Sequence, residues 1–265
     1  MSWLQTFVLA IIQGLTEFLP VSSSAHLILP SQLLGWEDQG LAFDVAVHIG
    51  TLFAVIWYYR HKLMDMTRGA LSGARTRTIN PDLRLALLIA WATLPAVVVG
   101  FLGKDLIAEH TRSVAVIASS TLVFGVLLWV SDVIGRREMT LMGIGLGVAT
   151  LVGLAQMLAL IPGTSRSGVT ITAALLLGLR RDDAANLSFL MSIPLILGAI
   201  VLMSFDLAQA EQIFTLAQLL VASVVAGVVA YLTIGFFIAL VTRLGMLPFV
   251  IYRLALGLLL VAFFL

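Results

Sequence analysis

The sequence predicts an all-α polytopic membrane protein with about six transmembrane helices and two re-entrant helical hairpins. Of its 265 residues, 60% are hydrophobic and only 11% are charged, whereas soluble domains average about 45–50% and about 25%. Several apolar runs approach the length of about 20 residues that a helix needs to cross a bilayer. Because these runs lack the period-two alternation of a transmembrane β-barrel, helices are the expected secondary structure.

Composition also excludes several kinds of site. The chain contains no cysteine, so disulfides and thiolate metal sites are absent. The net charge is +1 and no block of Lys and Arg is long enough to bind nucleic acid. The first residues lack a positive region and a small-residue cleavage site, so we expect no removable signal peptide.

The first hairpin is predicted over residues 3–35. Its two apolar arms, residues 4–15 and 27–34, are each too short to cross a bilayer. Between them, residues 17–26 contain a carboxylate, a proline, three consecutive hydroxyls and an imidazole. Polar, helix-breaking sequence at membrane depth is tolerated only where it is buried in protein or lines a wet cavity. This stretch is therefore the first candidate for chemistry.

The following apolar runs complete the predicted architecture. Six of them are long enough to span the membrane: 41–59, 83–102, 114–134, 187–205, 216–241 and 248–265. Residues 60–84 read as a basic loop. A second hairpin is predicted over residues 141–179, interrupted by polar residues at 161–168. Its first arm could span alone, but its return arm is too short, which favours a re-entrant hairpin.

Orientation follows from Lys and Arg, which collect on the cytoplasmic side of membrane proteins. Alternate threading of the runs places most basic residues on one side: Arg60, Lys62, Arg68, Arg75, Arg77, Arg84, Arg136, Arg137, Arg180, Arg181 and Arg243. The opposite loops carry only Lys104 and Arg112. The first hairpin is therefore expected to enter from the outer side, and the second from the cytoplasm.

This threading predicts a single domain, residues 1–265, built as an inverted repeat. Residues 1–134 would form the first half and residues 140–265 the second, each with one hairpin and three spans. The sequence Pro-Val-Ser-Ser from residue 20 resembles Pro-Gly-Thr-Ser from residue 162, and Gln13 and Gln156 lie at like positions upstream. Inverted repeats with discontinuous helices are a known transporter plan.

Glu17 and Arg166 are ionisable residues at the two hairpin breaks. Each would cost about 2.5–3.5 kcal/mol at a helix centre, so they are expected to pair. The pair could be purely structural, because removing one member of a buried pair is destabilising whatever its function. More hydroxyls surround them than an ion pair needs: Ser22, Ser23, Ser24, Thr164, Ser165, Ser167 and Thr170.

This combination of residues suits a phosphate group. A Pro-Gly turn followed by Ser and Thr begins a helix near Gly168, and the free N–H groups and dipole of a helix start favour an anion. Arg166 adds bidentate phosphate recognition. The predicted phosphate-binding residues are Ser22, Ser24, Ser165, Ser167, Gly168 and Thr170.

Proton chemistry is predicted on the first hairpin. Ser23 and His26 are three residues apart, hence on one face of a helix that begins after Pro20. A histidine can take a serine proton or protonate a leaving group. Gln13 and Glu17 share a face and could orient His26 or hold a divalent cation, Mg²⁺ or Ca²⁺. No organic cofactor is implied. The alternatives are that the serines only cap a helix and that His26 only satisfies a buried carbonyl.

The motif Gln-Gly-Leu-Thr-Glu-Phe-Leu-Pro-Val-Ser-Ser-Ser-Ala-His (residues 13–26) and the motif Pro-Gly-Thr-Ser-Arg-Ser-Gly-Val-Thr (residues 162–170) resemble the two signatures of the bacitracin-resistance, undecaprenyl-diphosphatase family. The resemblance extends over the whole chain. It implies a phosphatase of the bacterial inner membrane that removes the terminal phosphate of a C55 isoprenoid diphosphate, the lipid carrier of cell-wall synthesis. It also implies a cavity open to the outer side. The family pattern allows Glu or Gln at its first position, and Gln13 is the neutral option.

The mechanistic hypothesis has Ser23 attack the terminal phosphorus with His26 as base, giving a phosphoserine that water hydrolyses. Arg166 and the helix start after Ser167 would stabilise the phosphoryl oxygens. His26 as nucleophile is the alternative.

His48, within the span 41–59, is expected to pack and to bond a neighbouring helix. A transporter or flippase of a phosphorylated lipid is the rival function. The sequence leaves a homodimer open.

Overall fold

The computed structural model of the chain describes residues 2–111, 113–206 and 214–264, so Arg112 lies outside the described residues. The described chain is helical and contains no β-strand. Its helices are α1 (Trp3–Thr16), α2 (Ser23–Leu34), α3 (Gly40–Tyr58), α4 (Arg60–Thr76), α5 (Pro81–Thr111), α6 (Val114–Ile134), η1 (Leu141–Gly143), α7 (Leu146–Gln156), η2 (Met157–Leu160), α8 (Arg166–Leu176), α9 (Arg181–Asp206), α10 (Leu216–Leu244) and α11 (Leu247–Phe264).

The six predicted spans are confirmed. Six described helices are long and apolar enough to cross a membrane: Gly40–Tyr58, Pro81–Gly103, Val114–Ile134, Arg181–Phe205, Leu216–Leu244 and Leu247–Phe264. Only 28–44% of the residues in each of these windows are buried inside the molecule. Their other apolar side chains point outward, as helices that face lipid require. The chain is therefore a multi-pass membrane protein.

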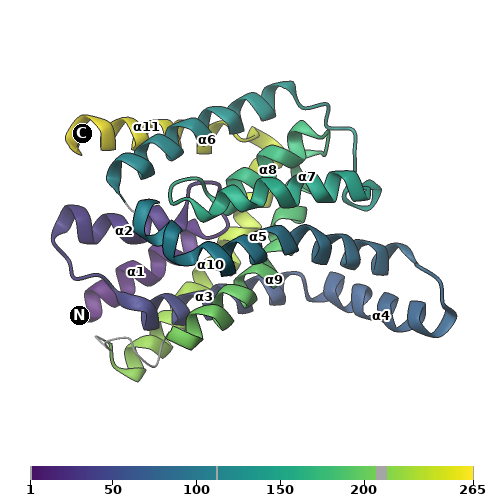
Figure 1. Cartoon of the computed structure of the whole chain (residues 1–265), viewed down its shortest axis with the longest axis horizontal. Coiled ribbons are helices and arrows are strands. Elements are labelled where there is room, and N and C mark those ends of the chain that lie inside the picture. Colours follow the sequence, from purple (N-terminus) through teal and green to yellow (C-terminus); the bar gives the residue numbers. More distant parts are fainter. Residues whose placement is uncertain (1, 112, 207–213, 265) are drawn as a thin grey trace.

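The prediction of a loop over residues 60–84 was wrong for most of its length. Residues 60–76 form helix α4, which lies beside the first turns of α5 and extends beyond the other helices (Figure 1). Two glycines, Gly69 and Gly73, let α4 approach residues 78–83 closely, and Lys62 pairs with Asp82 at 2.8 Å. The many charges hid this helix in the sequence, although Arg, Lys, Met and Leu all favour helices.

Two pairs of short helices form the interrupted regions. The helices α1 and α2 are joined by residues 17–22, whereas α7 and η2 are joined to α8 by residues 161–165. The pair α1 and α2 lies toward one end of the long axis of the molecule and the pair α7 and α8 toward the other (Figure 1). None of these helices reaches the length that spans a bilayer. The division into inverted repeats remains a prediction.

Small residues allow the helices to pack closely. A Cβ on Gly50 of α3 would lie 1.9 Å from the backbone oxygen of Ser223 in α10, and a Cβ on Gly153 of α7 would lie 2.4 Å from that of Ala92 in α5. No residue with a side chain fits at either position unless the helices move apart, because its Cβ would overlap the facing backbone. Because lipid supplies no hydrophobic drive between helices, close backbone approach is a main source of stability.

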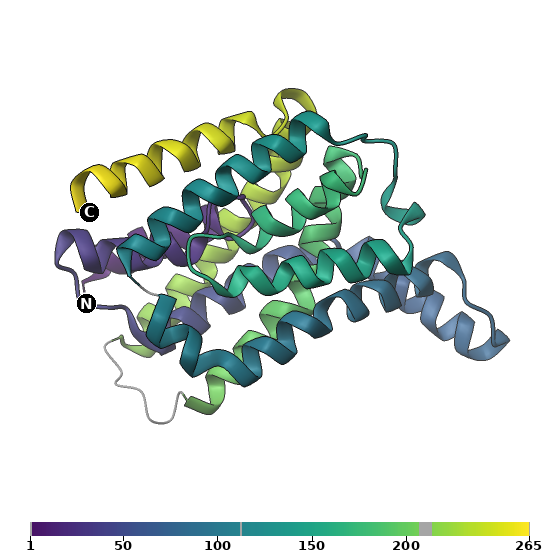
Figure 2. The ribbon, with the colours of Figure 1, turned by 45° about the horizontal axis from the view of Figure 1, so that its top comes forward.

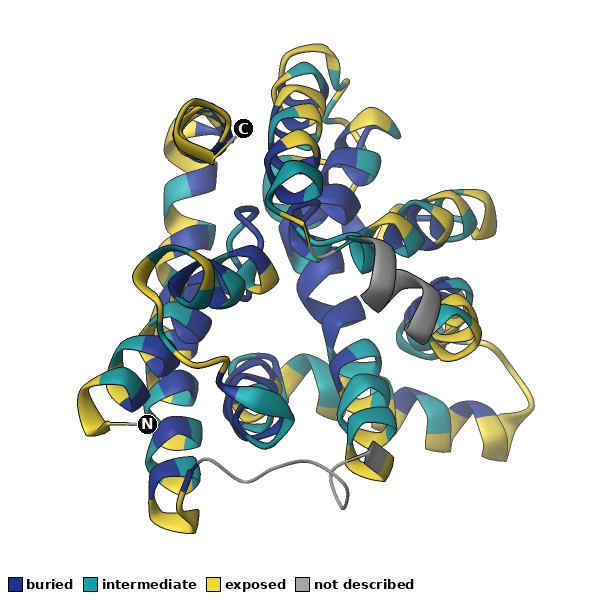
Figure 3. Cartoon of the chain, turned by 60° about the vertical axis from the view of Figure 1, so that its left-hand side comes forward, coloured by how far each residue is buried: buried dark blue, intermediate teal, exposed yellow. Residues whose placement is uncertain are grey.

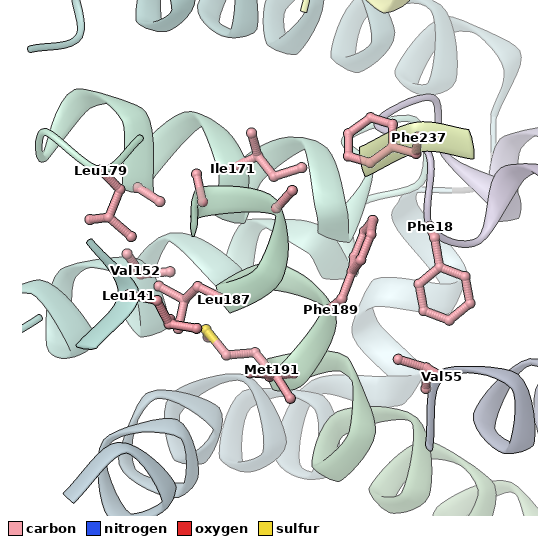
Figure 4. Close-up of a cluster of buried hydrophobic side chains, with 14 of the residues drawn as sticks. Phe18, Val55, Leu141, Val152, Ile171, Leu179, Leu187, Phe189, Met191 and Phe237 are labelled. Atoms are coloured by element: carbon pink, nitrogen blue, oxygen red, sulfur yellow. The ribbon is translucent and has the colours of Figure 1, made fainter. Parts of the chain in front are cut away.

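The buried interior surrounds the two interrupted regions. Figure 4 shows part of the largest apolar cluster, in which Phe18, beside the first break, lies near Phe189 of α9. The two rings meet edge to face with centroids 5.3 Å apart. Figure 3 shows that buried residues gather on the inner faces of the helices while exposed residues cover the outer faces. Ile171 and Phe237 extend the same cluster onto α8 and α10.

Candidate active site between the two chain breaks

The two interrupted regions touch each other directly. The backbone N–H of Gly163 donates to Ser22 Oγ at 3.2 Å, and Ser167 Oγ donates to the carbonyl of Leu19 at 2.8 Å. These contacts join residues that are more than 140 positions apart in the sequence. The structure thus brings the polar residues of both breaks to one place inside the membrane protein.

Glu17 and Arg166 form the predicted ion pair. Arg166 Nη2 lies 3.0 Å from Glu17 Oε1, and both side chains are nearly buried, with 10% and 7% of their surface exposed. Arg166 also donates to the carbonyl of Ser188 at 3.2 Å. Its guanidinium lies 5.8 Å from the centroid of the Phe18 ring, in cation–π geometry. The guanidinium is therefore fixed in position by a carboxylate, a carbonyl and a ring.

The second carboxylate oxygen of Glu17 collects the remaining donors. Glu17 Oε2 accepts from Gln13 Nε2 at 3.0 Å and from Ser23 Oγ at 2.8 Å. His48 Nε2 lies 3.9 Å from the same oxygen. These donors and the guanidinium favour the ionised carboxylate. The Ser23 hydroxyl therefore already donates its hydrogen to a carboxylate that can act as a base.

Both helices that follow the breaks begin at a serine with an unusual backbone. Ser22 precedes α2 with φ 75° and Ser165 precedes α8 with φ 70°. A positive φ at a non-glycine residue costs about 1–3 kcal/mol and persists only where surrounding structure holds it. Ser165 Oγ accepts from the N–H of Gly168 at 3.1 Å and so caps α8. Ser22 also accepts from the N–H of Gly163, so it joins the start of α2 to the second break.

A cavity of about 510 Å³ opens beside this cluster. Its polar lining residues are Glu17, Ser22, Ser23, Ser24, His48, Thr111, Gln156, Ser165 and Arg166. The remaining wall is largely apolar and comes mainly from α5 and α9, with Val97, Phe101 and Leu202 among its residues. Both amide atoms of Gln156 are buried without a hydrogen-bond partner. The cavity thus combines a polar end with a flank suited to a hydrocarbon chain.

Three of the predicted phosphate-binding residues lie behind the cavity wall. Thr170 Oγ1 donates to Ser188 Oγ at 2.7 Å, and both residues are buried. Ser167 and Gly168 are likewise buried in the first turn of α8, and neither lines the cavity. These residues hold α8 against α9 and the first break. The structure leaves Ser22, Ser24 and Ser165 of the predicted set on the cavity wall.

His26 is turned away from Ser23. Its Nδ1 lies 2.7 Å from the carbonyl of Ser22 and its Nε2 lies 2.5 Å from the hydroxyl of Tyr252. The His26 and Tyr252 rings stack with centroids 5.6 Å apart. Because the helix begins at Ser23 rather than directly after Pro20, Ser23 Oγ turns back to Glu17. In the described structure the expected Ser23–His26 hydrogen bond is absent, and His26 does not line the cavity.

Arg253 of α11 is a buried charge that the sequence analysis did not single out. Its guanidinium is 0% exposed and donates to the carbonyl of Pro20 at 3.0 Å and to the carbonyl of Gly163 at 2.8 Å. A third bond, at 3.3 Å, reaches the carbonyl of Thr121 in α6, along which α11 lies (Figure 2). One arginine therefore ties both breaks to α11. The sequence does contain a signal for Arg253, because an ionisable residue inside an apolar span is expected to have a functional role.

Comparison with known proteins identifies relatives of the whole chain. The family model described as bacitracin resistance protein BacA matches residues 6–259. A curated protein of Alcanivorax borkumensis named undecaprenyl-diphosphatase is 61% identical over 257 residues, which cover 97% of each chain. Both matches include the two breaks and the residues that line the cavity. The chain belongs to the bacitracin resistance protein BacA family.

Proposed function

We propose that this chain is an undecaprenyl-diphosphate phosphatase, which hydrolyses undecaprenyl diphosphate to the monophosphate and inorganic phosphate. The observation that carries the proposal is the position of Glu17, Ser23 and Arg166 at the polar end of a largely apolar cavity. A diphosphate matches the hydroxyls and the guanidinium, and an isoprenoid chain matches the apolar wall. The 61% identity to a protein named for this activity supports the same substrate.

Ser23 is the nucleophile in this proposal. Its Oγ forms a bond to the terminal phosphorus while the bond from that phosphorus to the bridging oxygen breaks, and undecaprenyl monophosphate leaves. The Ser23 proton passes to Glu17 Oε2, which already accepts it at 2.8 Å. Water then attacks the phosphoserine, the bond from phosphorus to Oγ breaks, and Glu17 returns its proton to Ser23. Glu17 replaces His26 as the base for Ser23, and His26 positions α2 against Tyr252 of α11.

Arg166 and the start of α8 stabilise the phosphoryl group. Phosphoryl transfer depends mainly on positioning and on neutralising the equatorial oxygens. Arg166 supplies a fixed guanidinium on the cavity wall, and the N-terminal end of α8 presents the positive end of its dipole. Ser22, Ser24 and Ser165 add hydroxyls on the same wall. In this proposal, these three serines keep the phosphate-binding role that the sequence predicts for them.

A divalent cation, Mg²⁺ or Ca²⁺, is proposed to bind with the substrate. The described residues contain no cluster of three or more His, Cys, Asp and Glu side chains that could hold a metal ion. Gln13 Oε1 is nevertheless a buried oxygen without a partner, next to Glu17. These two residues and the diphosphate oxygens would hold the cation, because Mg²⁺ commonly binds one or two carboxylates together with substrate phosphates. The cation would neutralise phosphate charge, and a chelator is expected to abolish phosphate release.

The proposed location is the bacterial inner membrane, with the cavity open to the outer side. The basic helix α4, Arg84 and the paired Arg181 support a cytoplasmic position for their end of the molecule. Released monophosphate would return to the lipid cycle of peptidoglycan synthesis.

Phosphate release in detergent separates this enzyme from a lipid flippase. Purified protein is mixed with undecaprenyl diphosphate in detergent, without a membrane or a gradient, and inorganic phosphate is measured with and without chelator. We expect multiple turnovers that stop when the cation is removed. Binding of the diphosphate without release of phosphate would instead support a carrier.

A further inference from the structure

His48 is a cavity-lining residue to which the proposed mechanism gives no role. It lies in α3, its side chain is 23% exposed, and its Nε2 is 3.9 Å from Glu17 Oε2. The expected bond to a neighbouring helix is replaced by one to the carbonyl of Asp44, on its own helix. Among the histidines whose side chains the structure describes, only His48 lines the cavity.

The hydrogen bond to Asp44 fixes the tautomer of His48. Nδ1 lies 2.7 Å from the Asp44 carbonyl, which can only accept, so Nδ1 carries the hydrogen. In the neutral ring Nε2 then has a free lone pair on the Glu17 side. His26 differs, because its Nδ1 and Nε2 both have close partners, the Ser22 carbonyl and the Tyr252 hydroxyl, and because it does not line the cavity.

The packing of α3 keeps His48 directed to the cavity. Gly50, two residues later, faces α10 at a separation that no side chain permits. Successive helix residues turn by about 100°, so His48 lies on the side of α3 opposite the contact with α10. The helix cannot rotate without breaking that contact, and the imidazole is held in a constant position.

We infer that His48 is the general base of the second half of the reaction, and this inference rests on the proposed hydrolysis. Ser23 Oγ and His48 Nε2 lie near the same carboxylate oxygen, at 2.8 and 3.9 Å. A water molecule beside Nε2 is therefore placed to attack a phosphorus bonded to Ser23. As the oxygen of water bonds to phosphorus, its proton moves to His48 Nε2, and the electron pair of the breaking bond stays on Ser23 Oγ. Glu17 returns its proton to Ser23, and His48 releases its proton to the cavity.

The charges that face His48 are few. Glu17 approaches from the end of α1 and Arg166 from the start of α8, and both line the same cavity. On α3 itself, Asp44 Oδ1 accepts from Gln39 Nε2 at 3.1 Å. On α9 the charged residues Asp182 and Asp183 lie in the first turn, and on α10 Arg243 lies in the last turn and Tyr231 near the middle; none of them lines the cavity.

The test compares His48→Gln with His61→Gln, which removes an exposed imidazole from α4. General acid–base catalysis contributes about 10²–10⁴-fold, so we expect His48→Gln to slow phosphate release at least about a hundredfold. The apparent KM should fall as well, because the second half of the reaction then limits the rate. Phosphoserine should accumulate at Ser23 in rapid-quench samples, since the first half of the reaction is intact. His61→Gln should match the natural sequence in rate and in phosphoserine level.

Chemical rescue completes the test. His48→Ala should regain rate when imidazole is added. Wild-type rates in His48→Gln would overturn the role of His48 and leave the proposed function intact. Failure of the unaltered protein to release phosphate would refute the function itself.

Discussion

The Glu17 carboxylate has four close partners in the site. It accepts from Gln13, Ser23 and Arg166 and lies near His48. Removal of two charges from water carries a penalty of several kcal/mol per ion. A simple ion pair would offset that penalty poorly, whereas several hydrogen bonds to one carboxylate offset it better. The same bonds place a base beside the Ser23 hydroxyl, so stability and chemistry depend on one side chain.

Replacement of Arg166 tests that dependence. Arg166→Ala leaves Glu17 buried without its cation, which should cost about 3–5 kcal/mol in unfolding free energy. The variant should still insert into the membrane, since the six spans are unchanged. Phosphate release should fall below detection, and thermal unfolding in detergent should report the lost stability. Turnover at a near-normal rate would remove Arg166 from the mechanism.

At the residue scale, the sequence predicts charges better than it predicts orientations. Glu17 and Arg166 were identified because ionisable residues at a hairpin break demand a partner. The same argument applies to Arg253, yet its acceptors are backbone carbonyls that no sequence pattern reveals. The spacing of Ser23 and His26 correctly places both near the start of one helix. It could not show that Ser23 turns back to Glu17 while His26 turns to Tyr252.

At the scale of elements, the contact between α3 and α10 holds one wall of the site. Gly50→Ala places a methyl group 1.9 Å from the Ser223 carbonyl oxygen, so the two helices must separate. Overpacking of this kind costs about 1–3 kcal/mol. We expect a lower unfolding temperature in detergent and slower phosphate release, because His48 and Glu17 would move apart.

Gly147→Ala is the matched control. A Cβ at Gly147 of α7 meets nothing within 4 Å, so this change should raise stability by about 0.5–1 kcal/mol through helix propensity. If both substitutions had the same effect on unfolding temperature, close packing of α3 on α10 would not be a source of stability.

The elements themselves follow from simple physical signals. Apolar length alone predicts the six spans, and polar interruptions predict both pairs of short helices. The helix α4 was missed because its charges hide the apolar side chains Leu63 and Met66, which pack against the core. Which helices become neighbours depends on contacts such as Gly153 against Ala92, and these are not visible in one sequence.

At the scale of the whole molecule, Arg253 ties α11 to both chain breaks. Arg253→Met leaves the carbonyls of Pro20 and Gly163 without their donor, and each unsatisfied group costs about 1–3 kcal/mol. We expect a large fall in unfolding temperature and loss of phosphate release. The control Arg243→Met, at an exposed helix end, should change neither property measurably. Equal effects of the two changes would argue against Arg253 as a tie between the breaks.

The orientation of the molecule can be tested with single cysteines, because the chain contains none. Thr76 in α4 and Glu37 between α2 and α3 are both exposed. A reagent that does not cross the membrane should label Glu37→Cys in intact cells and Thr76→Cys only after the cells are opened. The reverse labelling pattern would place the cavity on the cytoplasmic side.

Transfer of the phosphoryl group to Ser23 is the central step, and trapping it is the most direct test. The protein is mixed with undecaprenyl diphosphate labelled in its terminal phosphate, quenched in acid within milliseconds, and digested for mass spectrometry. We expect the label on Ser23 in the unaltered protein and no label in Glu17→Gln, which lacks the base. Label on His26, or no labelled residue while phosphate is released, would contradict the account.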